Sequence, residues 1–322
     1  MRKKLSLVVP MYNESAAIDD FFERVNKVSE SLSKEFETDL EIIAVNDGSK
    51  DDTLEKLTRW HKSQNNVGIV NLSRNFGQEP AVFAGLEKAG GDAVIVLDAD
   101  MQDPPEVIGE MVAKWTEGYD VVNAVRTRKK DKAFKRNSAG LYYRVLNKLS
   151  YKVRYPANVN NFRLISRRAL DTILAMPEKN KFYRGLVPFA GFKTASVVFA
   201  RQERTKGESK YNLKAMMRLA ADGIASTSTK PLIFSLYAGI ILCVLSVLGV
   251  APIIIFSLIK HFKPEYIVYS VIAITAFFTG VILIFMSISG FYIGKIFLEV
   301  KGRPFSIVQD FYAPEKDGNK DD

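Results

Sequence analysis

The chain is poor in cysteine and histidine, the residues that build thiolate and imidazole sites. Its 322 residues include one cysteine, Cys243, and two histidines, His61 and His261. One cysteine excludes a disulfide or a thiolate-metal cluster within the chain. Two histidines far apart in the sequence argue against Ser-His-Asp and Cys-His nucleophiles and against a histidine-rich zinc site.

Charge is absent from two long stretches. Residues 231–259 and 266–294 each run for 29 positions without Asp, Glu, Lys, Arg or His. Each exceeds the roughly 20 residues that cross a bilayer core, so we expect two transmembrane helices. The alternative is a helical hairpin buried in an oligomer. Because short two-span bundles gain contacts by association, we also expect a homo-oligomer.

Basic residues flank these stretches unevenly. The loop between them carries only Lys260 and Lys263. The outer flanks carry Lys206, Lys210, Lys214, Arg218, Lys230, Lys295, Lys301 and Arg303. By the positive-inside rule, the N-terminal region and the tail face the cytoplasm. We therefore predict a cytoplasmic domain at 1–205, a juxtamembrane helix at 206–230, a transmembrane region at 231–294 and a cytoplasmic tail at 295–322.

The net charge of +9 has a local origin. Residues 126–154 contain eleven Lys or Arg and one acid, Asp131. In a chain tied to a membrane, such a segment favours anionic lipid headgroups, and we expect no nucleic-acid partner. Apolar residues recur at helical spacing in 132–149 and 209–225, which predicts two amphipathic helices in the membrane interface. For the second helix the alternative is a docking face against the soluble domain.

Five short apolar segments alternate with amphipathic helical stretches in the first 125 residues. We expect strands at 5–9, 40–45, 67–72, 93–97 and 121–124. This alternation predicts an α/β domain with a mostly parallel, Rossmann-like sheet and right-handed crossovers. Ligands of such sheets bind beyond the carboxyl ends of the strands, where this chain places polar residues at 10–14, 46–49, 73–77 and 98–100.

The usual glycine-rich phosphate cradles are missing from this layout. No G-x-G-x-x-G follows the first predicted strand, and no G-x-x-x-x-G-K occurs. A diphosphate would then have to be neutralised by a carboxylate-held cation and by arginines.

Acidic residues end the fourth predicted strand, where 94–106 read VIVLDADMQDPPE. On an extended chain Asp98, Asp100 and Gln102 would point the same way. Two neighbouring carboxylates repel, and a hard divalent cation between them relieves the repulsion. The alternative is a turn whose Asp103 and prolines open the next helix.

Six segments together resemble a known family. They read PMYNE at 10–14, NDGS at 46–49, NLSRNFG at 71–77, DADMQDPP at 98–105, NFRL at 161–164 and GESKY at 207–211. The chain resembles the family 2 glycosyltransferases that load a sugar onto a polyisoprenyl phosphate. This group includes dolichol-phosphate mannose synthases and bacterial undecaprenyl-phosphate glucosyltransferases.

The resemblance implies a GT-A fold and an inverting, metal-dependent transfer of a hexose. The expected donor is a nucleoside-diphosphate sugar, first UDP-glucose, and the acceptor is undecaprenyl phosphate at the cytoplasmic face of the cell membrane. UDP-N-acetylglucosamine or another sugar is the alternative donor. The expected cofactor is Mg²⁺ or Mn²⁺.

The resemblance also implies roles for individual residues. The nucleotide would contact Pro10, Tyr12, Glu14, Asp47, Ser49 and Asp98. The metal would be held by Asp98, Asp100 and Gln102. The catalytic residues would be Asp100, Arg126, Arg163 and Lys210. The acceptor phosphate or lipid would meet Asn161, Lys206, Lys210, Lys214 and Arg218. Plain structural roles are the alternatives: a helix-start acid for Glu14, a turn former for Asp47 and surface charges for Arg126 and Arg163.

One position departs from the family pattern. Bacterial relatives commonly carry Asp-Phe-Arg where this chain has Asn161-Phe162-Arg163. Asparagine cannot act as a base at neutral pH. A phosphate monoester with a second pKa of about 6 is already anionic, so we expect the reaction to need no protein base.

Two other functions remain open on the sequence. A processive polysaccharide synthase shares the early motifs but normally shows Gln-x-x-Arg-Trp, and here Lys56 stands where the glutamine would be, before Arg59-Trp60. A non-catalytic membrane scaffold would have eroded acids at the strand ends, whereas Glu14, Asp47, Asp98 and Asp100 are all present.

Overall fold

The computed structural model describes residues 2–127, 159–179, 181–200, 232–242, 244, 245, 248 and 264–315. Its strands are β1 Lys3–Met11, β2 Thr38–Asn46, β3 Val67–Leu72, β4 Ala93–Val96, β5 Val121–Thr127, β6 Val159–Ser166, β7 Thr194–Ala200 and β8 Val308–Tyr312. Its helices are α1 Ile18–Phe36, α2 Thr53–Ser63, α3 Gln78–Lys88, the short 3₁₀ helix η1 Pro105–Val107, α4 Ile108–Thr116, α6 Arg167–Leu174, α7 Tyr183–Ala190 and α10 Pro264–Val300. A further apolar helix covers Leu232–Leu242.

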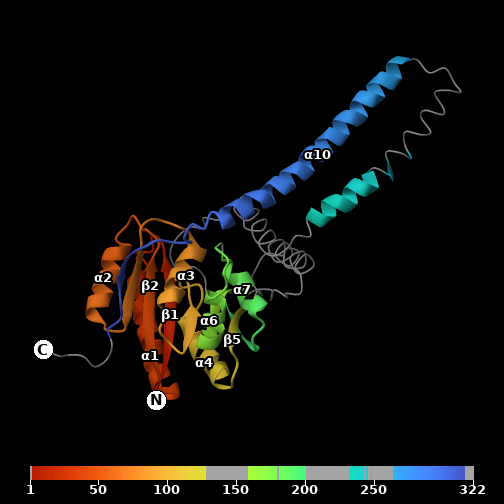
Figure 1. The fold of residues 1–322 in the computed structure, drawn as a ribbon. Helices are drawn as coiled ribbons and strands as arrows, with labels where there is room; N and C mark the ends of the chain where they lie inside the picture. Colours follow the sequence, from red (N-terminus) through yellow and green to blue (C-terminus); the bar gives the residue numbers. More distant parts are fainter. Residues whose placement is uncertain are drawn as a thin grey trace.

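The eight strands of the described residues form one sheet, in the order β7-β5-β6-β4-β1-β2-β3-β8. Figure 1 shows β1 and β2 side by side in this sheet. Within it β1 pairs in parallel with β2 and β4, β2 with β3, and β5 with β7, whereas β6 and β8 run antiparallel to their neighbours. The five predicted strands and the mostly parallel sheet are confirmed.

The chain reverses its direction of winding at the centre of the sheet. From β1 it proceeds to β2 and β3 on one side, and β4 then pairs with the free edge of β1 on the other side. A crevice opens beyond the carboxyl ends of strands at such a switch point, and ligands of α/β sheets bind there. The residues that follow β1 and β4 therefore occupy the expected binding position.

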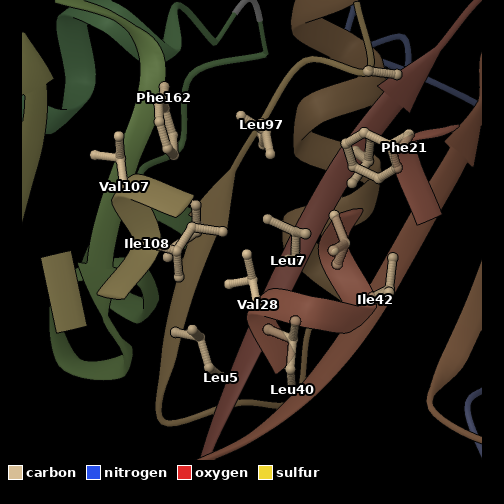
Figure 2. Close-up of a cluster of buried hydrophobic side chains, with 14 of the residues drawn as sticks. Leu5, Leu7, Phe21, Val28, Leu40, Ile42, Leu97, Val107, Ile108 and Phe162 are labelled. Carbon is tan, nitrogen blue, oxygen red and sulfur yellow. The ribbon is translucent and has the colours of Figure 1, made fainter. Parts of the chain in front are cut away.

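Two apolar layers hold this arrangement. Leu5 and Leu7 on β1 alternate with Val8, so the first two face the cluster with Phe21 and Ile108 (Figure 2), and Val8 faces the opposite cluster. On the Val8 side, helix α3 lies close to the sheet. A Cβ added at Gly85 would be 2.4 Å from a Val8 methyl, so no larger residue fits without movement.

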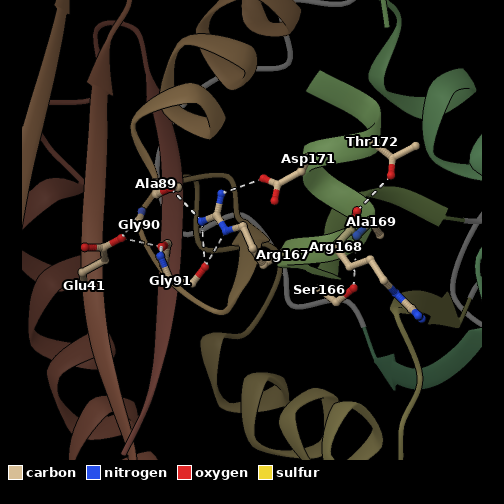
Figure 3. Close-up of polar contacts among 11 residues, drawn as sticks. Glu41, Ala89, Gly90, Gly91, Ser166, Arg167, Arg168, Ala169, Asp171 and Thr172 are labelled. Atoms are coloured by element: carbon tan, nitrogen blue, oxygen red, sulfur yellow. Dashed lines mark hydrogen bonds and ion pairs between the residues drawn. The ribbon is translucent and has the colours of Figure 1, made fainter. Parts of the chain in front are cut away.

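The amino ends of the strands are tied together by paired polar groups. Glu41 is 4% exposed, forms an ion pair with Lys4 and accepts hydrogen bonds from Ser6 Oγ and, at 2.6 Å, from the Gly90 amide. Arg167 donates to the carbonyl oxygens of Ala89 and Gly91, each at 2.7 Å (Figure 3). These contacts fix the loop before β4 from both sides.

An apolar helix leaves the domain. Helix α10 has 37 residues, so its length is about 55 Å, and Figure 1 shows it extending away from the sheet. Among the described residues one helix is long and apolar enough to cross a membrane, and its candidate span is Phe277–Val300, with a mean hydropathy of 2.1. The first predicted span is described only in part, through the shorter helix Leu232–Leu242. The predicted interface helices at 132–149 and 209–225 lie outside the described residues.

After α10 the chain returns to the sheet. Strand β8 pairs antiparallel with β3, from Ile69 with Tyr312 to Leu72 with Val308. Phe305 lies 6.0 Å from the Phe83 ring on α3, centre to centre. Residues 295–322 were predicted to form a cytoplasmic tail, and the structure places part of this segment, β8, in the sheet beside β3.

Candidate active site

Three aspartates gather beyond β4, at the switch point. Asp98 and Asp100 are partly buried, and Asp103 is 1% exposed. Burial, and after it the neighbouring carboxylates of Asp100 and Asp103, raise the pKa of Asp98 to about 6 against the opposing charges of Arg184 and Arg126. Gln78 at the start of α3 donates a 2.8 Å hydrogen bond to Asp98 Oδ1.

The acids come together through a turn. Strand β4 ends at Val96, and Met101 has a left-handed backbone with φ of 58°. The amide of Gln102 donates to Asp100 Oδ1 at 3.1 Å, which closes this turn. The expectation that Asp98, Asp100 and Gln102 alternate along an extended chain is therefore wrong, because the strand stops before them.

A cation could bind here with few protein ligands. Among the described residues no three His, Cys, Asp or Glu side chains converge on one point. The charge of Asp100 is close enough to contribute to the raised pKa of Asp98. Two carboxylates suit Mg²⁺ or Mn²⁺, which fill their remaining positions with water and substrate phosphates. The residues present fit a cation that the substrate helps to hold.

Arg126 is held beside the acids. It lies at the end of β5 and donates through Nε and Nη2 to the two carboxylate oxygens of Asp103, at 2.8 and 2.6 Å. Such a two-point contact fixes the plane of the guanidinium. Arg126 is thus an ordered, partly buried cation at the site and is no plain surface charge.

Strand β6 and helix α7 carry a second group of buried residues beside the site. Arg163 is 2% exposed and its guanidinium lies 5.0 Å from the centre of the Tyr183 ring. Glu79 accepts a 2.9 Å hydrogen bond from the Tyr183 amide, and burial raises the pKa of Glu79 against the opposing charges of Arg184 and Arg163. The surface-charge alternative for Arg163 is therefore wrong.

Arg184 is a site residue that sequence analysis missed. Its Nε donates to Asn161 Oδ1 at 2.9 Å, and its charge lowers the pKa values of both Asp98 and Glu79. It stands in the first turn of α7 with no motif around it. The neighbouring sequence therefore gave no signal that Arg184 belongs to the site.

Asn161 is buried, with 1% of its surface exposed. Its Oδ1 accepts from Arg184, whereas its Nδ2 has no hydrogen-bond partner among the described residues. A buried amide without a partner is costly, so a ligand oxygen placed there would be favoured.

A second loop follows β2 and lies against the loop after β3. Both oxygens of Asp47 accept backbone hydrogen bonds, from Phe76 at 2.7 Å and Gly77 at 3.0 Å. Burial raises the pKa of Asp47 and these two bonds oppose the rise. Gly48 has φ of 62°, and a Cβ there would lie 2.3 Å from the Arg74 carbonyl carbon, so only glycine fits.

The end of β1 meets this loop. Pro10 and Tyr12 are partly buried there, and Asn13 has a left-handed φ of 54°. The Asn13 amide donates to Ser49 Oγ at 3.0 Å, and the Glu14 amide donates to Thr53 Oγ1 at 3.1 Å. The structure thus gathers the predicted nucleotide residues Pro10, Tyr12, Glu14, Asp47 and Ser49 at one edge of the sheet. The predicted Lys206, Lys210, Lys214 and Arg218 lie outside the described residues.

The fold is that of a GT-A-like α/β domain with a mostly parallel sheet. The model of "Glycosyl transferase family 2" matches residues 6–174. The chain belongs to this family and is a glycosyltransferase.

Relatives match almost the whole chain. An uncharacterized glycosyltransferase, YkcC, of Bacillus subtilis is 41% identical over 96% of this chain and 94% of its own length. The SfII prophage-derived bactoprenol glucosyl transferase of Shigella flexneri is 41% identical over 95% of this chain and 97% of its own length. Among solved structures, a mannosyltransferase of Pyrobaculum calidifontis in complex with GDP-Man and Mn²⁺ has a TM-score of 0.50 at 14% identity, over 93% of this chain and 88% of that chain. At this identity the last similarity shows the fold alone.

Proposed function

We propose that the protein transfers glucose from UDP-glucose to a polyisoprenyl phosphate, with inversion, at the cytoplasmic face of the cell membrane. The observation that carries this proposal is the near-full-length similarity to relatives named bactoprenol glucosyl transferase. The acids at the switch point, with Arg126 and Arg184 beside them, support it.

In the proposed reaction a phosphate oxygen of the lipid attacks the anomeric carbon. The new carbon–oxygen bond forms on the face opposite the departing nucleoside diphosphate, whose bond to that carbon breaks. Two anions must approach, so the neighbouring guanidinium groups lower the barrier by screening their repulsion. A divalent cation held by Asp98 and Asp100, with Gln102 beside them, would neutralise charge on the leaving diphosphate.

Asn161 suits an acceptor that needs no base. Its Nδ2, which has no partner within the described ranges, can donate to a phosphate oxygen, and its Oδ1 already accepts from Arg184. Because the second pKa of a phosphate monoester is about 6, the attacking oxygen carries charge at neutral pH without deprotonation by the protein. In this proposal Asn161 and the basic residues 206–218 hold the acceptor.

The return of the chain to the sheet supports two membrane crossings. Strand β7 precedes the apolar region and β8 follows it, yet both belong to one sheet. A chain that begins and ends in the same domain crosses a membrane an even number of times. Helix α10 supplies one crossing in this proposal, and residues 231–259 supply the other. Association of several copies through these helices belongs to the same proposal.

One experiment tests the reaction directly. Membranes that contain the protein are incubated with undecaprenyl phosphate and a panel of nucleotide sugars, with Mg²⁺, Mn²⁺ or a chelator. We expect a glucosylated lipid from UDP-glucose that the chelator abolishes. A product only from UDP-N-acetylglucosamine would change the donor, a polymer would favour a processive synthase, and no transfer from any sugar would favour a scaffold.

A further inference from the structure

A series of hydrogen bonds connects β8, the strand that follows α10, to the loop that we expect to bind the nucleotide. Asp310 lies on β8, and Asn71 lies opposite it on β3. Asn71 Nδ2 donates to Asp310 Oδ2 at 3.0 Å, and Asn71 Oδ1 accepts from Asn46 Nδ2 at 2.8 Å. Asn46 Oδ1 in turn accepts from the Ser49 amide at 3.2 Å.

Asp310 determines which group of each asparagine donates and which accepts along this series of hydrogen bonds. An ionised carboxylate only accepts, so Asp310 requires the NH₂ group of Asn71 to face it. The oxygen of Asn71 must then face Asn46, and the oxygen of Asn46 must face the Ser49 amide. Asn71 and Asn46 are 7% and 2% exposed, so water does not replace a lost partner easily.

Ser49, at the end of this series, connects the loops after β1 and β2. Ser49 Oγ accepts from the Asn13 amide at 3.0 Å, and Asn13 Oδ1 accepts from the Lys50 amide at 2.8 Å. The loops after β1 and β2 are therefore joined at the end of the same chain of hydrogen bonds. These two loops carry the residues expected to contact the nucleotide.

We propose that Asp310 is a positioning residue for the nucleotide-sugar donor: acting through Asn71 and Asn46, it orients the loops that bind the nucleotide. The proposal rests on the proposed function for the identity of the donor. It gives the segment after the membrane helix a role in donor affinity, in addition to its place in the sheet.

Asp310→Ala removes the acceptor and lets both amides turn. We expect the KM for UDP-glucose and the Kd for UDP to rise about fivefold to tenfold, with kcat within about twofold. Hydrogen exchange at residues 46–50 should become faster in the nucleotide-free full-length protein. Unchanged exchange together with unchanged donor affinity would overturn the proposal.

A matched control separates positioning from strand docking. Tyr312 shares the face of Asp310 on β8, and its ring centre lies 5.8 Å from that of His61 on α2. Tyr312→Ala should weaken the docking of β8 and leave donor affinity unchanged. An equal loss of affinity in Tyr312→Ala and Asp310→Ala would mean that docking alone matters.

Exchanging the residues at positions 71 and 310 should restore the affinity for the donor that a single change loses. Asn71→Asp alone places two carboxylates side by side and should raise the KM for the donor. Adding Asp310→Asn supplies an NH₂ donor in the reverse direction, while position 71 still accepts from Asn46, so the double variant should recover. No recovery would contradict the proposal. If the wild-type protein binds no UDP, the proposed function fails, and the exchange measurement still decides whether Asp310 orients the loops.

Discussion

The two ends of the sheet use the same kinds of residues in opposite ways. At the amino ends, Glu41 and Arg167 are surrounded by partners that satisfy them, from Lys4 and Ser6 to the carbonyl groups of Ala89 and Gly91. At the carboxyl ends, aspartates lie close to one another, and a buried asparagine has an amide NH₂ group with no hydrogen-bond partner in the described part of the chain. The first end stabilises the fold, and the second holds unfavourable groups that a ligand can compensate.

The largest effect should follow from changing an acid at the carboxyl end. Asp100→Asn keeps the size of the side chain and removes the charge that would hold the cation. We expect transfer to fall at least roughly a hundredfold, equivalent to ~3 kcal/mol of barrier, with an unchanged melting temperature. Lipid-linked glucose formed at saturating Mn²⁺ measures the first quantity. Full turnover in this variant would refute the metal assignment.

Arg184 tests whether the missed residue belongs to the site. Arg184→Ala removes a positive charge that favours the ionised form of Asp98. It also removes the hydrogen bond that orients Asn161. We expect kcat/KM to fall by roughly thirtyfold, and less in Arg184→Lys, which keeps the charge and loses the Nε contact. Steady-state kinetics with the acceptor varied would show the loss. Equal activity of Arg184→Ala and wild type would place Arg184 outside the reaction.

The amino end should respond in the opposite way. Glu41→Ala leaves the Gly90 amide and Ser6 hydroxyl without their buried acceptor, so we expect a loss of about 2 kcal/mol in the free energy of unfolding. Denaturation in detergent measures this loss. Activity per folded molecule should stay at the wild-type level, and a selective loss of activity would contradict the division between the two ends.

Glu79 predicts a dependence of stability on pH. Burial raises the pKa of the Glu79 carboxyl group in the folded state, so the folded protein binds a proton on this group more tightly than the unfolded chain does. Its contribution to stability is complete below the ordinary pKa of a glutamate and is lost as the pH rises through the raised value. Melting temperatures measured across this range should vary less in Glu79→Gln than in wild type. Identical pH profiles would show that Glu79 titrates normally.

The smallest effect on kcat is expected at Asn161. Asn161→Asp gives the Asp-Phe-Arg order that the family resemblance leads us to expect, and a reaction without a protein base should gain little from it. The KM for the acceptor should rise, because a carboxylate cannot donate to the phosphate and repels it, whereas we expect kcat to change by less than about threefold, with the same pH profile. A large gain in kcat together with a new acidic limb in the profile would show that a base matters after all.

The sequence predicted the parts of the site that depend on chain order alone. The carboxyl ends of parallel strands lie at the same end of the sheet, so the sequence alone predicts that Asp47 and Asp98 lie there. The conformation beyond β4 was predicted wrongly, because the left-handed Met101 turns the chain where extension was assumed. Arg184 and Asp310 could not be predicted, because each reaches the site through packing of segments distant in sequence and neither stands in a recognisable motif.

The central claim is that the carboxylates of Asp98 and Asp100 hold a divalent cation on the diphosphate of the donor. The most direct measurement is a manganese anomalous-scattering map from crystals grown with Mn²⁺ and UDP. The account predicts one peak within ligand distance of both carboxylates and of the diphosphate. Bound UDP with no manganese peak between these aspartates would contradict it.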